Sequence, residues 1–99
     1  AAAVDGGHGE LFVQQFAGRT LEATSELLNL PPTQAAGIIS AETVIGPGAN
    51  ALVEARDSGR AIAGWPSAQN ALRLPEALRS LAPKPIYARA PDARAKNAA

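Results

Sequence analysis

Cysteine is absent from this 99-residue chain, which excludes disulfides, thiolate metal sites and thiol catalysis. The absence fits a cytoplasmic protein. The sequence has no run of about 18 apolar residues, the length needed for a transmembrane helix. Aromatic residues make up only 4% of the chain. We therefore expect the bulky part of the core to come from Leu, Ile and Val, together with Phe16 and Trp65.

Methionine is also absent, even at position 1. A translated chain normally begins with methionine, and this one opens directly on an apolar stretch. We therefore expect the sequence to be a fragment or a processed piece of a longer protein.

The formal net charge is zero, whereas a protein that grips nucleic acid by itself normally carries a basic excess. The charge is uneven, because four basic residues and one acidic residue between Lys84 and Lys96 give that stretch a charge of +3. We interpret residues 84–99 as an extended basic tail. Such a tail is either solvated or docks on an acidic partner surface or an RNA backbone.

The remaining residues, 1–83, predict one α/β domain with a mixed sheet and short helices. Two strands are expected to flank the glycine turn at residues 6–9, and a third strand is expected over residues 21–30. A helix is expected over 33–40 with Ala35, Ile38 and Ile39 inward, then a buried strand at 43–45. A second helix is expected over 50–56 with Ala51, Leu52 and Ala55 available to the core, then a brief strand at 61–63.

The longest helical pattern follows Trp65 and places Ala68, Ala71, Leu72, Leu78 and Leu81 on one face. Pro75 interrupts this pattern, so we expect either a kink or two helices, the second starting at Pro75. Trp65 is interpreted as a core anchor at the helix start.

A glycine-rich segment from Gly46 to Ala51 matches the pattern G-x-G-x-x-G/A of dinucleotide-binding turns, with Gly46 and Gly48 as weak cofactor-binding candidates. Pro47 lacks one of the N–H groups that such a cradle uses, and no acidic residue stands near positions 66–70 to hold a ribose. A structural turn is therefore the favoured interpretation, and a nucleotide site the alternative.

His8, the single histidine, stands between Asp5 and Glu10. The trio raises the question of a metal site or an acid–base cluster. A hairpin turn would instead direct these side chains into solvent, and Asp5 can accept hydrogen bonds from the backbone of the turn. The favoured interpretation is a solvated turn. The sequence also contains no G-x-S-x-G, H-E-x-x-H or P-loop lysine motif, so we expect no catalytic residues and no metal.

Three segments resemble the bacterial TsaB (YeaZ) family, which was once described as glycoprotease-like. Residues 4–12, VDGGHGELF, are similar to its D-A-R-x-G-E-V-Y segment, and residues 44–49, VIGPGA, to its V-x-G-x-G-A turn. Residues 85–94, PIYARAPDAR, are similar to its P-x-Y-L-R-x-P-D-A-K ending. The matching motif positions are Asp5, Gly9, Glu10, Tyr87, Arg89, Pro91 and Asp92.

The resemblance implies the C-terminal lobe of an actin-like (ASKHA, RNase H-like) fold, without the N-terminal half of the family. It implies a non-catalytic scaffold without a cofactor. Such a scaffold supports a TsaD-like transferase, joined by a TsaE-like ATPase, that modifies adenosine 37 of tRNA with a threonylcarbamoyl group. It further implies a possible homodimer, tRNA contact only through partners, and no membrane.

This sequence departs from the family pattern at several positions. Gly6 and Gly7 replace the usual Ala-Arg, Phe12 replaces tyrosine, Ala88 replaces leucine, and Pro75 breaks a helix that is usually continuous. Two alternatives to the scaffold stay open. One is a nucleotide- or phosphate-binding domain that uses the Gly46–Ala51 turn, and the other is a residual glycoprotease-like peptidase.

Overall fold

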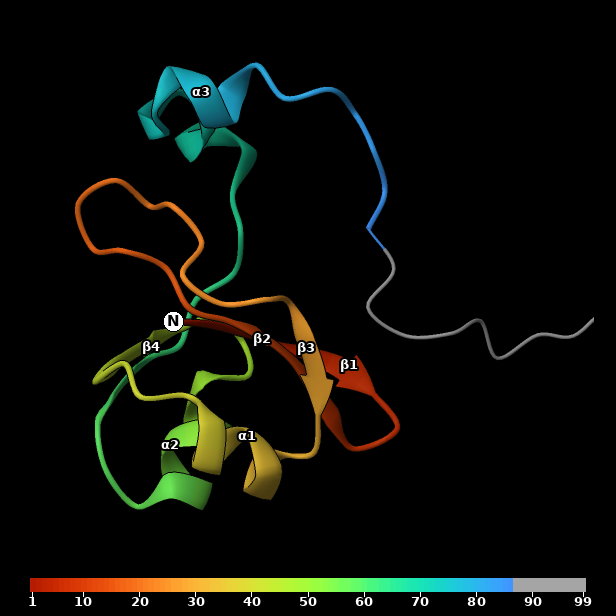
Figure 1. Cartoon of the computed structure of the whole chain (residues 1–99), viewed down its shortest axis with the longest axis vertical. Helices are drawn as coiled ribbons and strands as arrows, with labels where there is room; N and C mark the ends of the chain where they lie inside the picture. Colours follow the sequence, from red (N-terminus) through yellow and green to blue (C-terminus); the bar gives the residue numbers. More distant parts are fainter. Residues whose placement is uncertain (87–99) are drawn as a thin grey trace, which may run out of the picture.

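The computed structural model describes residues 1–86, and the tail positions Tyr87, Arg89, Pro91 and Asp92 lie outside the described residues. Five strands, two short helices and a terminal helical segment follow one another along the chain (Figure 1). In order they are β1 (Ala2–Gly7), β2 (Glu10–Gln14), β3 (Leu28–Leu30), α1 (Pro32–Ile38), β4 (Thr43–Ile45), α2 (Ala49–Arg56), β5 (Arg60–Ile62), the 3₁₀ helix η1 (Ala68–Arg73) and α3 (Glu76–Arg79). The predicted α/β class with a mixed sheet is confirmed.

The five strands form one sheet in the order β3-β2-β1-β4-β5. β2 runs antiparallel to both β1 and β3, whereas β4 runs parallel to β1 and β5 runs parallel to β4. Parallel neighbours need a crossover connection, and α2 provides the one between β4 and β5. β2 is therefore the one strand of the sheet that points against all the others.

A two-residue turn, His8-Gly9, closes the β1–β2 hairpin. Both turn residues have positive φ, +55° and +73°, as the primed hairpin turns require. The register slips between Asp5 and Gly7, so Gly6 is an extra residue that forms a bulge. A Cβ at Gly6 would lie 2.9 Å from the ring of Phe12, so a side chain at this position would displace the ring.

One face of the sheet packs against α1 and α2, which lie side by side beneath it in Figure 1. The side chains alternate between the two faces, as they do in any strand. Ala3, Leu11, Val13 and Val44 point to the helices and are buried. From the helical layer, the core is completed by Ala35, Ile39, Ala49 and Leu52. Three of these eight buried residues are alanines, so the helices can approach the sheet closely.

The opposite side of the sheet, here called the open face, carries Ala2, Val4, Phe12, Ile45 and Ile62. Ile45 pairs with Ala2 on one side and with Ile62 on the other, so these three form a row across β1, β4 and β5. Ile45 is 51% exposed, and the side chains of Val4 and Ile62 are also exposed. The sheet is therefore apolar on both faces, although α1 and α2 cover only one.

The predicted third strand is shorter than expected, because only Leu28–Leu30 joins the sheet. Upstream, Ser25 accepts hydrogen bonds from the Gln14 side chain at its carbonyl oxygen and from the Gln15 backbone at its hydroxyl. These bonds replace the regular ladder, and one isolated bridge joins Phe16 to Ala23.

Several expected core positions are wrong. Ile38 is 51% exposed at the end of α1, and both Ala51 and Ala55 are exposed on α2. α2 begins at Ala49, one residue earlier than predicted, and it buries Ala49 together with Leu52, which the sequence predicted correctly. The strand at 43–45 is buried at Val44 alone, because Ile45 lies on the open face.

Residues 65–81, here called the C-terminal strap, differ most from expectation. Two helical pieces do flank Pro75, as predicted, and the second begins at Glu76. However, no residue of either piece is buried. Trp65 is 81% exposed and Leu72 79% exposed, so the prediction of Trp65 as a core anchor is wrong.

No helix in residues 1–86 is long and apolar enough to cross a membrane.

Candidate interaction surface

The hairpin around His8 is held by hydrogen bonds to the side chains of Asp5 and Glu10. The Asp5 side chain accepts a hydrogen bond from the Gly7 N–H at 3.0 Å, which confirms the expected turn-capping role of Asp5. Glu10 accepts a hydrogen bond from the Asn29 side-chain amide at 3.3 Å, which ties β2 to β3. Within residues 1–86, no group of three His, Asp or Glu side chains is placed to hold a metal ion. The geometry therefore gives Asp5 and Glu10 structural partners.

The Gly46–Ala51 turn packs directly on β1. The Gly48 N–H donates to the Ala3 carbonyl at 2.9 Å, and the Gly46 N–H donates to the Ile62 carbonyl at 3.0 Å. A Cβ at Gly46, where φ is +127°, would overlap the Ala3 carbonyl oxygen. Ala49 N–H in turn donates to Gly46 O at 3.1 Å. These three N–H groups are already used within the fold, so they are not available to bind a phosphate.

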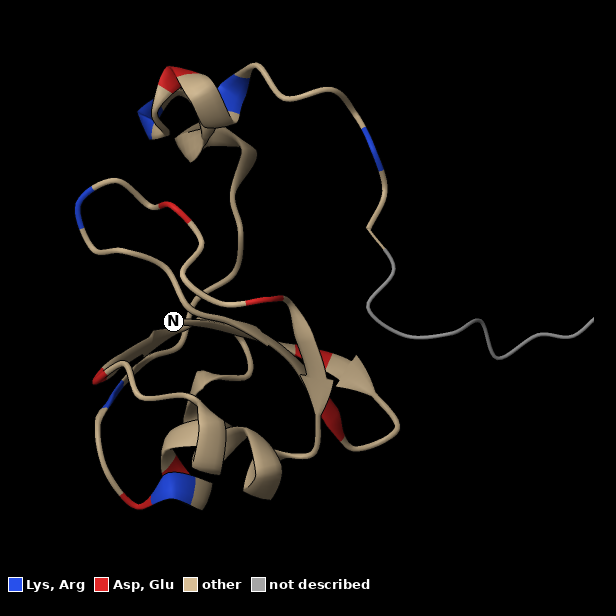
Figure 2. Cartoon of the chain, viewed as in Figure 1, with Lys and Arg blue, Asp and Glu red and all other residues tan. Residues whose placement is uncertain are grey.

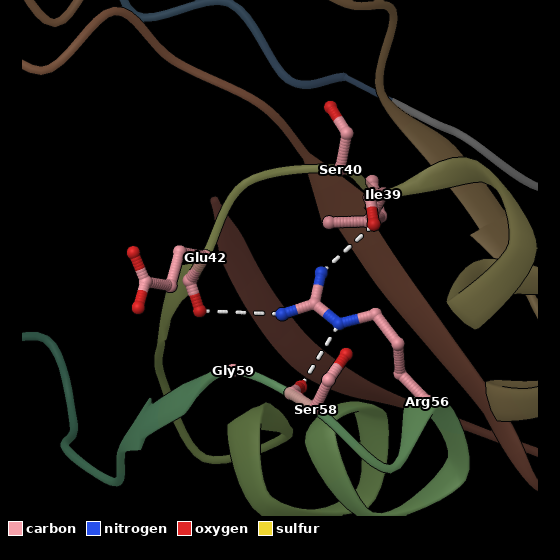
Figure 3. Close-up of a pocket in the computed structure, with 6 residues that line it drawn as sticks. All are labelled: Ile39, Ser40, Glu42, Arg56, Ser58 and Gly59. Carbon is pink, nitrogen blue, oxygen red and sulfur yellow. Dashed lines mark hydrogen bonds between the residues drawn. The ribbon is translucent and has the colours of Figure 1, made fainter.

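Arg56, a residue that the sequence analysis did not single out, connects two loops at one end of the helical layer (Figure 3). Its Nη1 donates to the Ile39 and Ala41 carbonyls, both at 2.8 Å. Its Nη2 donates to Glu42 O at 3.2 Å, and its Nε donates to Ser58 O at 3.0 Å. Four of the five guanidinium N–H groups are thus engaged with carbonyl oxygens.

Gln15 completes the same arrangement from the other side. Its side-chain oxygen accepts hydrogen bonds from Ser40 N at 3.0 Å, Ser40 Oγ at 3.1 Å and Ala41 N at 3.0 Å. Arg56 therefore binds the carbonyls of the α1–β4 loop, and Gln15 binds its amides. A hollow of about 340 Å³ lies beside Arg56, but its guanidinium has too few free donors to grip an anion bidentately. We assign this cluster a structural role.

A second, apolar concavity lies on the other side of the sheet. This apolar groove has a volume of about 640 Å³. Its floor includes Ala2 and Ile45 from the open face, and one wall comes from Phe16 and Leu21 of the loop that follows β2. Leu74 and Leu78 of the C-terminal strap also line it.

No charged side chain lines the groove, although the Ala1 amino group lies at its edge. Burial lowers the pKa of this amino group below its usual value, and the positive charge of Arg56 lowers it further. In Figure 2 the loop between β2 and β3 and the C-terminal strap both carry charged residues, but none of these lines the groove. The groove can therefore pack apolar side chains, and no charged side chain lines it.

Sequence reasoning did not find this groove. Its residues come from β1, β4, the loop after β2 and the strap, which are distant in the chain. The one available signal was the alternation in β4 and β5, where Ile45 and Ile62 occupy the face opposite Val44 and Ala61.

Comparison with known proteins gives no family model, no curated protein and no solved structure that matches this chain.

Proposed function

We propose that this chain is the C-terminal actin-like lobe of a TsaB-like scaffold that supports a TsaD-like transferase in threonylcarbamoyl modification of tRNA. The observation that carries the proposal is the sheet order β3-β2-β1-β4-β5 with β2 alone reversed. An RNase H-like lobe has this order, with helical crossovers joining its parallel strands.

A second observation supports the proposal. Two of the three segments that resemble the family, residues 4–12 and 44–49, lie next to each other in the fold. The Gly48 N–H donates to Ala3 O at the start of the hairpin strand, and a Cβ at Gly48 would lie 2.9 Å from Leu11 Cδ2. The spacing of these motif glycines therefore matches a packing requirement between distant parts of the chain.

The apolar groove also fits a scaffold better than an enzyme. None of the described polar or charged residues is buried, and no charged side chain lines the groove. A surface of this kind binds other protein segments through packing. In this proposal the parent protein acts through a TsaD-like subunit and a TsaE-like ATPase, and it contacts tRNA only through them.

A chimera tests the proposal. The lobe is fused to the N-terminal half of a bacterial TsaB and expressed in cells depleted of TsaB, and threonylcarbamoyladenosine is measured in hydrolysed tRNA by mass spectrometry. The chimera should restore the modification. A control with Ala3→Asp should not, because it places a charge in the core. The lobe alone should not restore it either, because half of the proposed fold is missing.

A chimera that is folded and abundant, yet neither restores the modification nor binds the TsaD-like subunit, would contradict the proposal. Calorimetry with ATP and ADP tests the nucleotide-binding alternative on the lobe itself. Micromolar affinity for either nucleotide would contradict a scaffold-only role. Because the Gly46 and Gly48 N–H groups are engaged inside the fold, we expect no measurable heat of nucleotide binding. The peptidase alternative predicts peptide cleavage, for which the sequence offers no nucleophile constellation.

A further inference from the structure

The C-terminal strap and the open face of the sheet present apolar surfaces toward the same space. Leu74 and Leu78 line the apolar groove from the strap, and Ile45 and Ala2 line it from the sheet. Figure 1 places η1 and α3 on the side of the sheet opposite α1 and α2. The groove is thus a gap between two apolar layers of one chain.

We propose that the strap is a hinged lid that closes onto the open face and collapses this groove. The occupant of the face is then a named segment of the chain itself. This inference does not depend on the proposed function.

The apolar side chains of the strap remain exposed to solvent in the open arrangement. None of its residues is buried, and Leu72, Leu81 and Trp65 each expose more than two-thirds of their surface. Contact between such apolar surfaces is favourable in water, because it removes apolar area from the solvent. Closure would cover the two strap leucines that line the groove, Leu74 and Leu78, together with the row formed by Ala2, Ile45 and Ile62.

The connection at the base of the strap allows such a movement. Residues 63–67 join β5 to η1 without regular secondary structure, and a Cβ at Gly64 would meet no atom within 4 Å. η1 and α3 hold their own local hydrogen bonds, for example Leu78 N–H to Pro75 O at 2.9 Å and Arg79 Nε to Leu74 O at 3.0 Å. The helical pieces can therefore move as a unit while the linker changes conformation.

Hydrogen–deuterium exchange of the 99-residue chain tests closure. The amides of residues 69–80 should exchange at least about tenfold more slowly than those of an isolated peptide covering residues 65–83, because a closed lid excludes water from them. Exchange at the peptide rate in the intact chain would overturn the proposal.

Two isoleucines that are each 51% exposed provide a matched pair of variants. Ile45→Lys places a charge on the open face and should return the strap amides to the peptide rate, whereas Ile38→Lys lies on α1 and should leave their protection unchanged. Equal effects of the two variants would contradict closure. Leu78→Glu in the strap is a second test variant, and it should leave the domain folded because Leu78 is outside the buried core. It too should abolish protection in residues 69–80 while β1 and β2 stay protected, and retained protection of the strap would contradict closure.

Discussion

Replacing Arg56 with methionine should remove the guanidinium and keep most of the apolar stem. Four carbonyl oxygens then lose their donor, those of Ile39, Ala41, Glu42 and Ser58. The bonds to Ile39 and Ala41 are partly buried, whereas those to Glu42 and Ser58 are exposed. Water can replace the donor at the two exposed carbonyls but only incompletely at the other two.

An unsatisfied buried carbonyl costs about 1–3 kcal/mol, so two partly buried ones predict a loss of about 2–4 kcal/mol. This is a large share of the roughly 5–15 kcal/mol that stabilises a typical domain. Urea unfolding followed by far-ultraviolet circular dichroism measures the loss. Fluorescence of Trp65 suits this experiment less well, because that side chain is 81% exposed in the folded chain.

The urea midpoint should fall by about 1–2 M at an unchanged slope, for a slope of about 2 kcal/mol per M, in the middle of the range for small domains. Arg60→Met is the matched control, because Arg60 is an exposed arginine on the neighbouring strand β5. It should change stability by less than about 0.5 kcal/mol. Equal effects of the two substitutions, or a loss below about 0.5 kcal/mol for Arg56→Met, would refute the assignment of Arg56 as the residue that joins the two loops.

Three further substitutions give clear expectations in the same unfolding assay. Gly46→Ala should destabilise the fold by about 2–4 kcal/mol, because its Cβ would overlap Ala3 O and φ is +127°. Gly37→Ala should stabilise by about 0.5–1 kcal/mol, because Gly37 lies in α1 with open space around its Cβ position. Trp65→Ala should change stability by less than about 0.5 kcal/mol. A loss of several kcal/mol there would instead show that the indole is packed in the folded chain.

Local chemistry predicted the parts of the fold that depend on neighbouring residues. The glycine-rich turn predicted the β1–β2 hairpin, and the Asp5 side chain bonds to the Gly7 backbone as expected. The strap divides at Pro75 as predicted, and α1 begins at Pro32, one residue before the predicted start. Such features are set within a few residues, and sequence spacing is therefore sufficient to find them.

Features that join distant residues were not predictable in the same way. The Arg56 arrangement depends on carbonyls 14 to 17 residues away and on a loop that is also held by Gln15, the residue after β2. Nothing in the sequence around Arg56 indicates those partners. Likewise, the strap has a helical apolar pattern, but the pattern does not say whether any surface is available to cover it.

The position of the alanines explains why the large apolar residues are found outside the core. Ala3, Ala35 and Ala49 occupy positions where α1 and α2 meet the sheet, so that interface is filled with few bulky side chains. Larger groups such as Phe16, Ile45 and Ile62 then remain on the side away from these helices. The sequence is 46% hydrophobic, and residues 1–86 bury eight hydrophobic side chains, so much of the apolar surface remains for a second layer. Because the strap carries leucines on the same side of the sheet, it is the part of the chain best placed to supply that layer, and any partner that binds the open face must compete with it.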